Sequence, residues 1–555
     1  MIALVDRKNF VVSILLKFGV SLYLAKLCFY GTEPHHDGYI LGSAAAVADS
    51  LPVHSGAFSQ YGPMTPWIAG LFLKLTSVSV FNLRVLSAIV AFVIYLIMGR
   101  IIYNLGFSRF ISQLVSTSWV LINHVTTTEF DGTFFLWPSL ISTLFLILAL
   151  DFALASIKHR DNKWLLVVSG ILISFASFTR IQSLLVLAIL TTYVLIVFHK
   201  IQKLLYLFAG VCIGSFLIVG NLVILGSFRD YVEQVLIWPA SFYSSIGLGT
   251  NYDKFLFTLF LSLPIASILY FRLGNRILGK FTGLKRLILV VLFGVTTFAV
   301  SVYSGNLLES DENTLLRLVI GDQLNRVIFW PLYLCFMGSI VLAGSILIKR
   351  FNKEDLRRLE IVFIASFGLS VTPQIFPKPD IGHVWWISPL LIPPTLVLMR
   401  NLRINLTAYG LPLVSILIAG LMSTSHYLLQ EWTPYTYEPL VGTFAKQERV
   451  ESMKVYEPLT KFLKKNNALF LCENGIHAAA ARRYAANDQW FVNWGPRSLA
   501  DENTRLQAAS NIVVCDEPKR TAEEISIKYG MQVIYFSEVK NSDTYTSLAI
   551  MSKAK

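Results

Sequence analysis

Residues 11–30, VVSILLKFGVSLYLAKLCFY, form an apolar run, and the polar stretch 31–40, GTEPHHDGYI, follows directly. A run of about 20 apolar residues is long enough to cross a bilayer as a helix. The polar stretch is therefore expected within a few residues of a membrane surface. An ionisable side chain is costly there unless it has a task, so Asp37, preceded by His35 and His36, is the first candidate for a functional residue.

The composition of the whole chain is that of a membrane protein. Of its 555 residues, 54% are hydrophobic and 15% are charged, which is more apolar surface than a soluble domain can bury. The net charge of +13 lies in short basic clusters between apolar runs, as the positive-inside rule predicts, so nucleic acid is not an expected partner. Five cysteines are too few for a disulfide framework.

The apolar runs predict an all-α polytopic fold with about 13 membrane spans. The expected spans are residues 11–30, 80–102, 107–125, 132–153, 164–179, 182–198, 204–225, 253–271, 287–303, 326–348, 359–375, 385–400 and 406–429. Basic clusters occupy every second connection, which predicts a cytoplasmic N-terminus and a tail outside. Two shorter runs, 39–51 and 67–74, are expected as helices lying in the membrane interface.

The tail changes character, and we expect the chain to divide into a membrane domain, 1–432, and a second domain, 433–555. In the tail, apolar bursts alternate with helical patterns, the bursts at 468–472, 511–515 and 531–536 and the helices at 477–486 and 520–529. This alternation predicts a small extracytoplasmic α/β domain. Because it carries no nucleotide-binding glycine loop, an accessory role is expected, shielding the site or holding an acceptor.

Asp37 has two compatible interpretations. Followed by Gly38 and a small-residue helix, it could cap that helix by accepting hydrogen bonds from free amides. A carboxylate held in this way also has the fixed orientation that a general base needs. His36 and Asp37 could share a metal ion, but a histidine pair on a loop is more often solvated, and the sequence requires no divalent cation.

Further ionisable residues occupy the next two outside connections. Asp131 begins the fourth span ahead of apolar residues that would bury it beside the first loop, whereas Glu129 is interpreted as an interfacial residue. Arg180 lies in a tight turn between the fifth and sixth spans. Its planar fork of donors suits a lipid phosphate, and the alternative is that it snorkels to a lipid headgroup.

A late outside loop is the densest in polar and proline residues. It covers 373–389, PQIFPKPDIGHVWWISP, and its prolines stiffen it. Lys378 and His383 are close enough in sequence to hold one phosphate at the membrane face. The adjacent Trp385 and Trp386 are expected to be aromatic anchors at the membrane interface.

Taken in order, these parts resemble the glycosyltransferase-C superfamily of multi-span enzymes, which includes the protein O-mannosyltransferases, the lipid A aminoarabinose transferase and the mycobacterial arabinofuranosyltransferases. The resemblance covers residues 8–430 and is carried by Asp37, Tyr61-Gly62-Pro63, Asp131-Gly132, Thr179 to Gln182, and Lys378 to His383. Many members have two adjacent acids in the first loop, whereas His36 precedes Asp37 here, which leaves any metal dependence open.

The resemblance implies transfer of a sugar from a polyprenyl-phosphate carrier to a glycan, lipid or protein acceptor, with inversion, on the outer face of a bacterial plasma (inner) membrane. It makes Asp37 the base and Asp131 a supporting acid. The residues implied to bind the lipid phosphate or the sugar are Tyr61, Arg180, Gln182, Lys378, Asp380 and His383. Because a polyprenyl phosphate already leaves well, the enzyme has only to position the donor, balance charge and remove a proton.

Three other functional classes remain open. A transporter or flippase of lipid-linked sugars would also have many spans, but transporters place their sites near the bilayer midplane and often show internal repeats, which this chain lacks. A glycan ligase or polymerase is compatible with the same residues. A non-catalytic scaffold would leave the loop acids without a purpose.

Overall fold

The computed structural model describes the first half of the chain almost completely and parts of the second half. The described residues are 2–29, 31, 34–121, 134, 136–159, 162–198, 201–237, 239, 364, 367–368, 370–371, 374, 381–401, 435–438, 443–446, 457–466, 468–471, 506–515, 518–540 and 545–553. The expected spans 253–271, 287–303, 326–348 and 406–429 lie outside them, as does most of 359–375.

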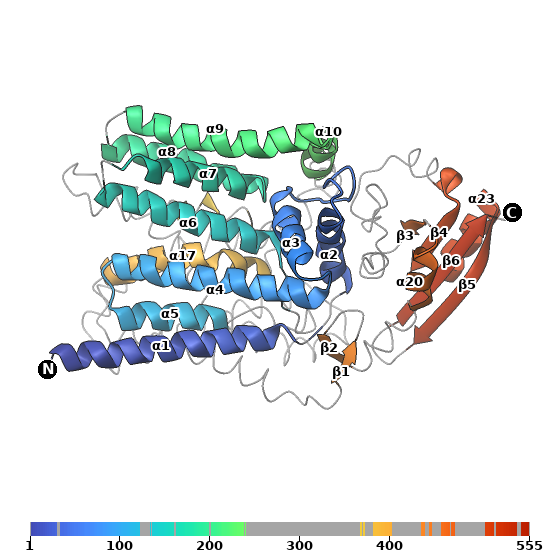
Figure 1. Cartoon of the computed structure of the whole chain (residues 1–555), viewed down its shortest axis with the longest axis horizontal. Helices are drawn as coiled ribbons and strands as arrows, with labels where there is room; N and C mark the ends of the chain where they lie inside the picture. Colours follow the sequence, from blue (N-terminus) through green and yellow to red (C-terminus); the bar gives the residue numbers. More distant parts are fainter. Residues whose placement is uncertain are drawn as a thin grey trace, which may run out of the picture.

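Helices make up the described part of the N-terminal region. They are α1 (Ile2–Leu27), α2 (Pro34–Ala48), α3 (Met64–Leu75), α4 (Val80–Asn104), α5 (Arg109–Leu121), α6 (Pro138–Lys158), α7 (Trp164–Ser177), η3 (Ile181–Ser183), α8 (Leu184–Phe198), α9 (Ile201–Ile224), α10 (Phe228–Tyr231), η4 (Val232–Ile237) and α17 (Ile381–Asn401). The long helices run side by side, and the short α2 and α3 lie at one end of them (Figure 1).

Among the described residues, three helices are long and apolar enough to cross a membrane, namely Val80–Asn104, Pro138–Ser156 and Gln202–Ile224. With the composition, they make the chain a membrane protein. The number of 13 spans and the orientation of the termini stay predictions.

The helix boundaries agree with the sequence-based ranges to within about five residues, except at α1, which begins at Ile2 and not at residue 11, and at α6. This helix was expected from residue 132 and begins at Pro138. Trp137 before it has an extended backbone, and proline is favoured at the first helical position because it has no amide hydrogen to leave unpaired. The expected helices 39–51 and 67–74 correspond to α2 and α3, which pack against each other.

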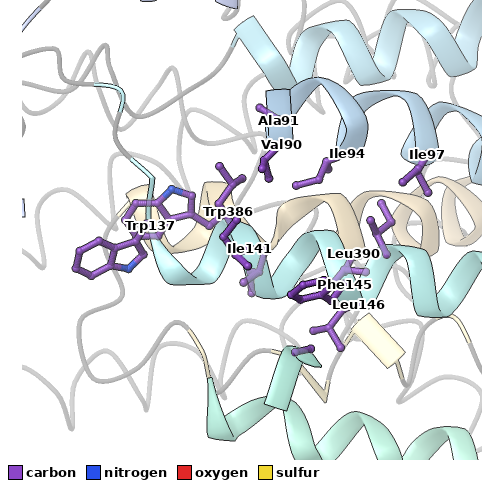
Figure 2. Close-up of a cluster of buried hydrophobic side chains, with 14 of the residues drawn as sticks. Val90, Ala91, Ile94, Ile97, Trp137, Ile141, Phe145, Leu146, Trp386 and Leu390 are labelled. Atoms are coloured by element: carbon purple, nitrogen blue, oxygen red, sulfur yellow. The ribbon is translucent and has the colours of Figure 1, made fainter. Parts of the chain in front are cut away.

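A central part of the buried core lies between α4, α6 and α17. Figure 2 shows that side chains from the three helices meet there, Val90, Ala91, Ile94 and Ile97 from α4, Ile141, Phe145 and Leu146 from α6, and Trp386 and Leu390 from α17. Because these positions recur at helical spacing, each helix presents one apolar face to the others. This packing joins the late segment 381–401 to the first half of the chain.

Helices α7 and α9 approach each other through glycines. A Cβ atom at Gly170 would lie 2.2 Å from the carbonyl oxygen of Leu207, and one at Gly210 would lie 2.0 Å from that of Val167. Small residues permit such close backbone contact between membrane helices. The outer face of α9 carries exposed apolar side chains, including Phe216 and Ile224, which suits contact with lipid.

The described tail forms a mixed sheet with a helix on each face. The strands are β3 (Leu469–Leu471), β4 (Asn511–Cys515), β5 (Met531–Lys540) and β6 (Tyr545–Lys553), in the spatial order β3-β4-β6-β5. Strand β3 is parallel to β4, and β6 is antiparallel to both of its neighbours. A separate strand pair, β1 (Tyr435–Glu438) and β2 (Thr443–Lys446), is antiparallel.

Alternate residues of β4 account for the two faces of the sheet, since successive side chains point to opposite sides. Val513 packs with α20 (Glu457–Leu463), whereas Ile512 and Val514 pack with α23 (Pro518–Tyr529). Strand β3 lies within the expected apolar burst 468–472, β4 coincides with 511–515, β5 extends 531–536, and α23 covers the expected helix 520–529. The expected helix 477–486 lies outside the described residues, and the division at residue 432 stays a prediction.

Candidate functional site

Asp37 forms a buried ion pair with an arginine that the sequence analysis did not single out. Asp37 lies in the first turn of α2 and is 2% exposed. Its Oδ2 accepts a hydrogen bond of 2.7 Å from Nη2 of Arg84, which lies on α4 and is 0% exposed. Because α2 begins at Pro34, Asp37 lies inside the first turn and is not the residue that caps it.

The same guanidinium closes the first loop. Nη1 of Arg84 donates to the carbonyl oxygen of Gly31 at 2.7 Å, just after the end of α1. Gly31 has φ +84°, a left-handed conformation that glycine adopts without strain. Arg84 thus holds both the start of the loop and the carboxylate of Asp37. The signal that could have found it is an arginine inside an apolar run, because such residues are rare and usually paired.

Tyr39 connects the Asp37 helix to the loop that precedes α3. Its hydroxyl accepts a hydrogen bond from the amide of Gln60 at 2.8 Å and lies 3.3 Å from the hydroxyl of Ser59. Its ring meets the Tyr61 ring edge-on at 6.2 Å. Two residues after Asp37, the helix therefore contacts the Tyr-Gly-Pro step directly.

The glycine of the Tyr61-Gly62-Pro63 step packs on the turn that carries Arg180. The amide of Gly62 donates to the carbonyl oxygen of Thr179 at 3.2 Å. A Cβ atom at Gly62 would lie 1.6 Å from the carbonyl oxygen of Phe178, so no other residue fits without a backbone shift. The Tyr61-Gly62-Pro63 step can approach the backbone of Phe178 and Thr179 this closely because residue 62 has no side chain.

This contact places Tyr61 against Arg180. The guanidinium carbon of Arg180 is 5.4 Å from the centre of the Tyr61 ring, within the range of a cation–π interaction. Nη1 of Arg180 donates to the hydroxyl of Ser139, in the first turn of α6. Arg180 is 6% exposed and has an extended backbone between α7 and η3, so its side chain lies inside the protein and does not snorkel.

The late segment reaches the same turn through Gln374. Its Nε2 donates to the hydroxyls of Ser183 at 3.0 Å and Ser142 at 3.4 Å. Ser183 lies in η3, three residues after Arg180, and Gln182 beside it is half-buried. Gln374 therefore ties the start of the stretch 373–389 to α6 and to the Arg180 turn.

The prediction that Trp385 and Trp386 anchor the chain at the membrane interface is wrong, because both are buried inside the protein, 0% and 1% exposed. The Trp385 ring stacks on Trp119 with centroids 5.0 Å apart, and each indole nitrogen donates to the other residue's carbonyl oxygen. The Trp386 ring stacks on Trp137 at 5.4 Å. Trp137 also meets the Tyr61 ring at 5.5 Å.

Contacts therefore link helix α2 to residues that are distant in the sequence. Asp37 of this helix pairs with Arg84, and Tyr39 of the same helix contacts Tyr61, which lies against Arg180. Asp131, Lys378 and Asp380 lie outside the described residues. His36 falls in α2, and His383 falls in the first turn of α17. In the described part of the chain, no group of three or more His, Cys, Asp or Glu residues could hold a metal ion.

Neither a family model nor a curated protein matches the sequence. Solved structures do resemble it. The oligosaccharyltransferase of Archaeoglobus fulgidus with zinc and sulfate has 9% sequence identity and a TM-score of 0.46, over 95% of this chain and 72% of that chain. ArnT from Cupriavidus metallidurans bound to undecaprenyl phosphate has 11% identity and a TM-score of 0.42, over 98% of this chain and 97% of that one. At these TM-scores the likeness carries no argument of its own, so the proposed function rests on the residues of this chain.

Proposed function

We propose that this chain is a membrane glycosyltransferase that moves a sugar from a polyprenyl-phosphate carrier to a cell-envelope glycan, lipid or protein acceptor, with inversion, on the extracytoplasmic face. One observation carries the proposal. Helix α2, which carries the buried carboxylate Asp37, contacts Tyr61 through the ring of Tyr39, and the Tyr61 ring lies against the buried guanidinium of Arg180. Buried charges at the ends of membrane helices are costly and usually functional.

In the proposed reaction Asp37 is the general base. An acceptor hydroxyl oxygen forms a bond to the anomeric carbon, the bond from that carbon to the phosphate oxygen breaks, and the phosphate leaves with the electron pair. The hydroxyl proton goes to the Asp37 carboxylate. Arg84 holds Oδ2 of that carboxylate, which fixes its direction, and a positioned base typically contributes about 10²- to 10⁴-fold to the rate. Asp131 is proposed as a supporting acid.

Arg180 is proposed to bind the phosphate of the donor. The hydroxyl of Ser139 and the ring of Tyr61, both uncharged, fix the direction of its guanidinium. A guanidinium fork matches the oxygens of a phosphate and balances the charge that develops as the phosphate leaves. Lys378 and His383 are proposed as further phosphate ligands, and Gln182 and Asp380 as residues that bind the sugar.

The C-terminal residues 433–555 are proposed to form an accessory domain outside the membrane. Their described sheet buries a side-chain core on each face, Val513 with Leu459 on one and Ile512 with Ile525 on the other. A sheet covered in this way needs no membrane to bury its apolar residues. The N-terminus is proposed to lie in the cytoplasm of a bacterial cell, since the basic clusters alternate along the sequence.

The proposal is tested by incubating the purified protein with a panel of polyprenyl-phosphate sugars and measuring release of free polyprenyl phosphate. We expect the wild type to release it from at least one donor and Asp37→Asn to be slower by about 100-fold or more. The matched control is Asp151→Asn. Asp151 on α6 pairs with Arg100, at the end of α4 that lies about 24 Å from Arg84 by helical rise.

The outcomes separate the functional classes. Loss of release in Asp37→Asn at a temperature where this variant is still folded, without such a loss in Asp151→Asn, supports the role of Asp37 as the base. Movement of intact donor across a vesicle membrane without release would make the chain a flippase. Wild-type turnover in Asp37→Asn would reduce Asp37 to the structural partner of Arg84.

A further inference from the structure

The loop that carries Tyr61 is held by three separate segments, which accept hydrogen bonds from three of its amides. The amide of Ser59 donates to Oε1 of Gln234 at 3.1 Å. That of Gln60 donates to Tyr39, and that of Gly62 to Thr179, at 2.8 and 3.2 Å. A loop fixed at so many points has little freedom left, as a preorganised binding site requires.

Gln234 is the most distant of these partners in the sequence. It lies in the π-helical segment η4 and is 1% exposed. Its Oε1 also accepts from Nδ1 of His54 at 3.0 Å, while its Nε2 donates to the His54 carbonyl oxygen at 2.9 Å. One amide side chain therefore makes three hydrogen bonds to the segment 54–59. Short π-helical turns occur often at functional sites.

The conformation of His54 shows how firmly this contact is made. His54 is 0% exposed, has φ +71°, and its ring meets Tyr231 edge-on at 5.3 Å. A residue other than glycine keeps a left-handed conformation only where its surroundings determine it. Gln234 and Tyr231 provide those surroundings.

The contact is passed on to the donor site through Ser59. The Ser59 amide is held by Gln234, and its hydroxyl donates to the carbonyl oxygen of Tyr61 at 2.9 Å. Tyr61 in turn lies against Arg180. We propose that Gln234 is a positioning residue that holds Tyr61 against Arg180 and so sets the affinity of the site for the lipid phosphate. This inference rests on the proposed function.

The chain offers a matched control. The hydroxyls of Ser55 and Ser227 lie 2.6 Å apart and join the same two segments as Gln234 does, but neither contacts 59–62 in the bonds described above. Gln234→Leu removes all three bonds of the amide. Gln234→Glu keeps an oxygen that can accept the hydrogen bond from the Ser59 amide. It should therefore retain part of the affinity for the lipid phosphate. Ser227→Ala removes one bond of the same interface.

Hydrogen exchange measured by mass spectrometry on the full-length protein tests the positioning directly. We expect the amides of 59–62 to exchange about tenfold faster in Gln234→Leu, because a buried amide loses its acceptor. Ser227→Ala should leave their exchange unchanged. Equally faster exchange of these amides in Gln234→Leu and Ser227→Ala would show that Gln234 has no more effect on the loop than any other bond between the two segments. That result would overturn the proposal.

Binding of a polyprenyl monophosphate then tests the link to the donor. Gln234→Leu should weaken binding about five- to tenfold, and Gln234→Glu should weaken it less. In the double variant Gln234→Leu/Tyr61→Leu, binding should be no weaker than in Tyr61→Leu alone, because Gln234 acts through Tyr61.

Additive losses in this cycle would overturn the proposal, since Gln234 would then act by another route. A wild type that fails to bind the lipid phosphate would overturn the proposed function, and with it the donor-site role of Gln234. Normal exchange in the wild type would distinguish that failure from misfolding, because the amides of 59–62 would still be protected.

Discussion

The Asp37 carboxylate and the Arg84 guanidinium come from residues 47 apart in the sequence, and each compensates the other's charge in a buried place. Such a pair adds little net stability, since desolvation offsets the attraction, but breaking it leaves one charge unpaired. The pair is thus well suited to hold a base in place.

We expect Asp37→Asn to destabilise the protein by about 3–5 kcal/mol, because the Arg84 charge stays buried without its carboxylate. The double variant Asp37→Asn/Arg84→Met should recover most of that loss while remaining inactive. Thermal unfolding in detergent measures both. A double variant as unstable as the single one would show that the loss does not come from the unpaired charge of Arg84.

Gly62→Ala is expected to displace the turn at Arg180. The new methyl group would lie 1.6 Å from the carbonyl oxygen of Phe178, and overpacking of this kind costs about 1–3 kcal/mol. Release of polyprenyl phosphate should fall together with the melting temperature. The control is Gly19→Ala on α1, where no atom lies within 4 Å. Normal turnover in Gly62→Ala would show that the Tyr61 step need not touch the Arg180 turn.

His54 predicts a loss of stability in acid. Burial lowers its pKa from 6.5 to about 4, although the hydrogen bond that its ring donates to Gln234 acts in the opposite direction. The unfolded chain takes up the proton below pH 6.5 and the folded chain only near pH 4. The contribution is therefore fully present above pH 6.5 and is lost as the pH falls toward 4, by roughly 3 kcal/mol.

Chemical unfolding between pH 7 and pH 4 measures this dependence. The comparison is with His54→Asn, since asparagine tolerates the left-handed backbone and does not titrate. An identical pH dependence in that variant would assign the effect to other groups.

Among the elements, helices could be predicted from the sequence because hydrophobic periodicity is a local property. The ranges of α4, α7, α8 and α9 follow from their apolar residues alone. What could not be predicted is which face of a helix another segment covers. Trp385 stacks on Trp119 from 266 residues away, and a tryptophan pair after a polar loop looks the same in the sequence whether it faces lipid or protein.

In the candidate site too, the sequence predicts individual residues but not their distant partners. Asp37 and Arg180 could be selected because they lie between apolar runs, and Tyr61 because it belongs to the Tyr-Gly-Pro step on which the resemblance rests. Their partners could not be selected in the same way. Gln234 is an ordinary residue in its own segment, and only the fold brings it to Ser59, 175 residues earlier.

The packing of α7 on α9 gives a prediction at the scale of whole elements. Gly210→Val should destabilise the pair strongly, because a Cβ atom there meets the carbonyl oxygen of Val167 at 2.0 Å. Gly220→Val on the same helix should have little effect, since no atom lies within 4 Å of a Cβ atom there. Melting temperatures in detergent compare the two. Equal losses would mean that the helices do not depend on this contact.

In the described part of the molecule, the elements that carry Asp37, Tyr61 and Arg180 lie at one end of the helix array. Figure 1 shows α2, α3 and α10 at the end opposite the N-terminus of α1. The turn before η3, which carries Arg180, contacts the loop before α3 there. If the N-terminus is cytoplasmic, as the basic clusters predict, this end faces the outside. A lipid-linked donor in the outer leaflet would then reach Arg180 with its phosphate.

The central claim, that the Arg180 site holds the phosphate of a lipid carrier, is tested most directly by equilibrium binding. The affinities for a polyprenyl monophosphate and for the matching polyprenol, which lacks the phosphate, are measured on the wild type and on Arg180→Gln. Thermal unfolding first checks that the two proteins are similarly stable. We expect the wild type to prefer the phosphate and Arg180→Gln to lose about 10- to 100-fold of that preference, the effect of a hydrogen bond to a charged group. Equal binding of both lipids by the wild type, or an unchanged preference in Arg180→Gln, would contradict the account.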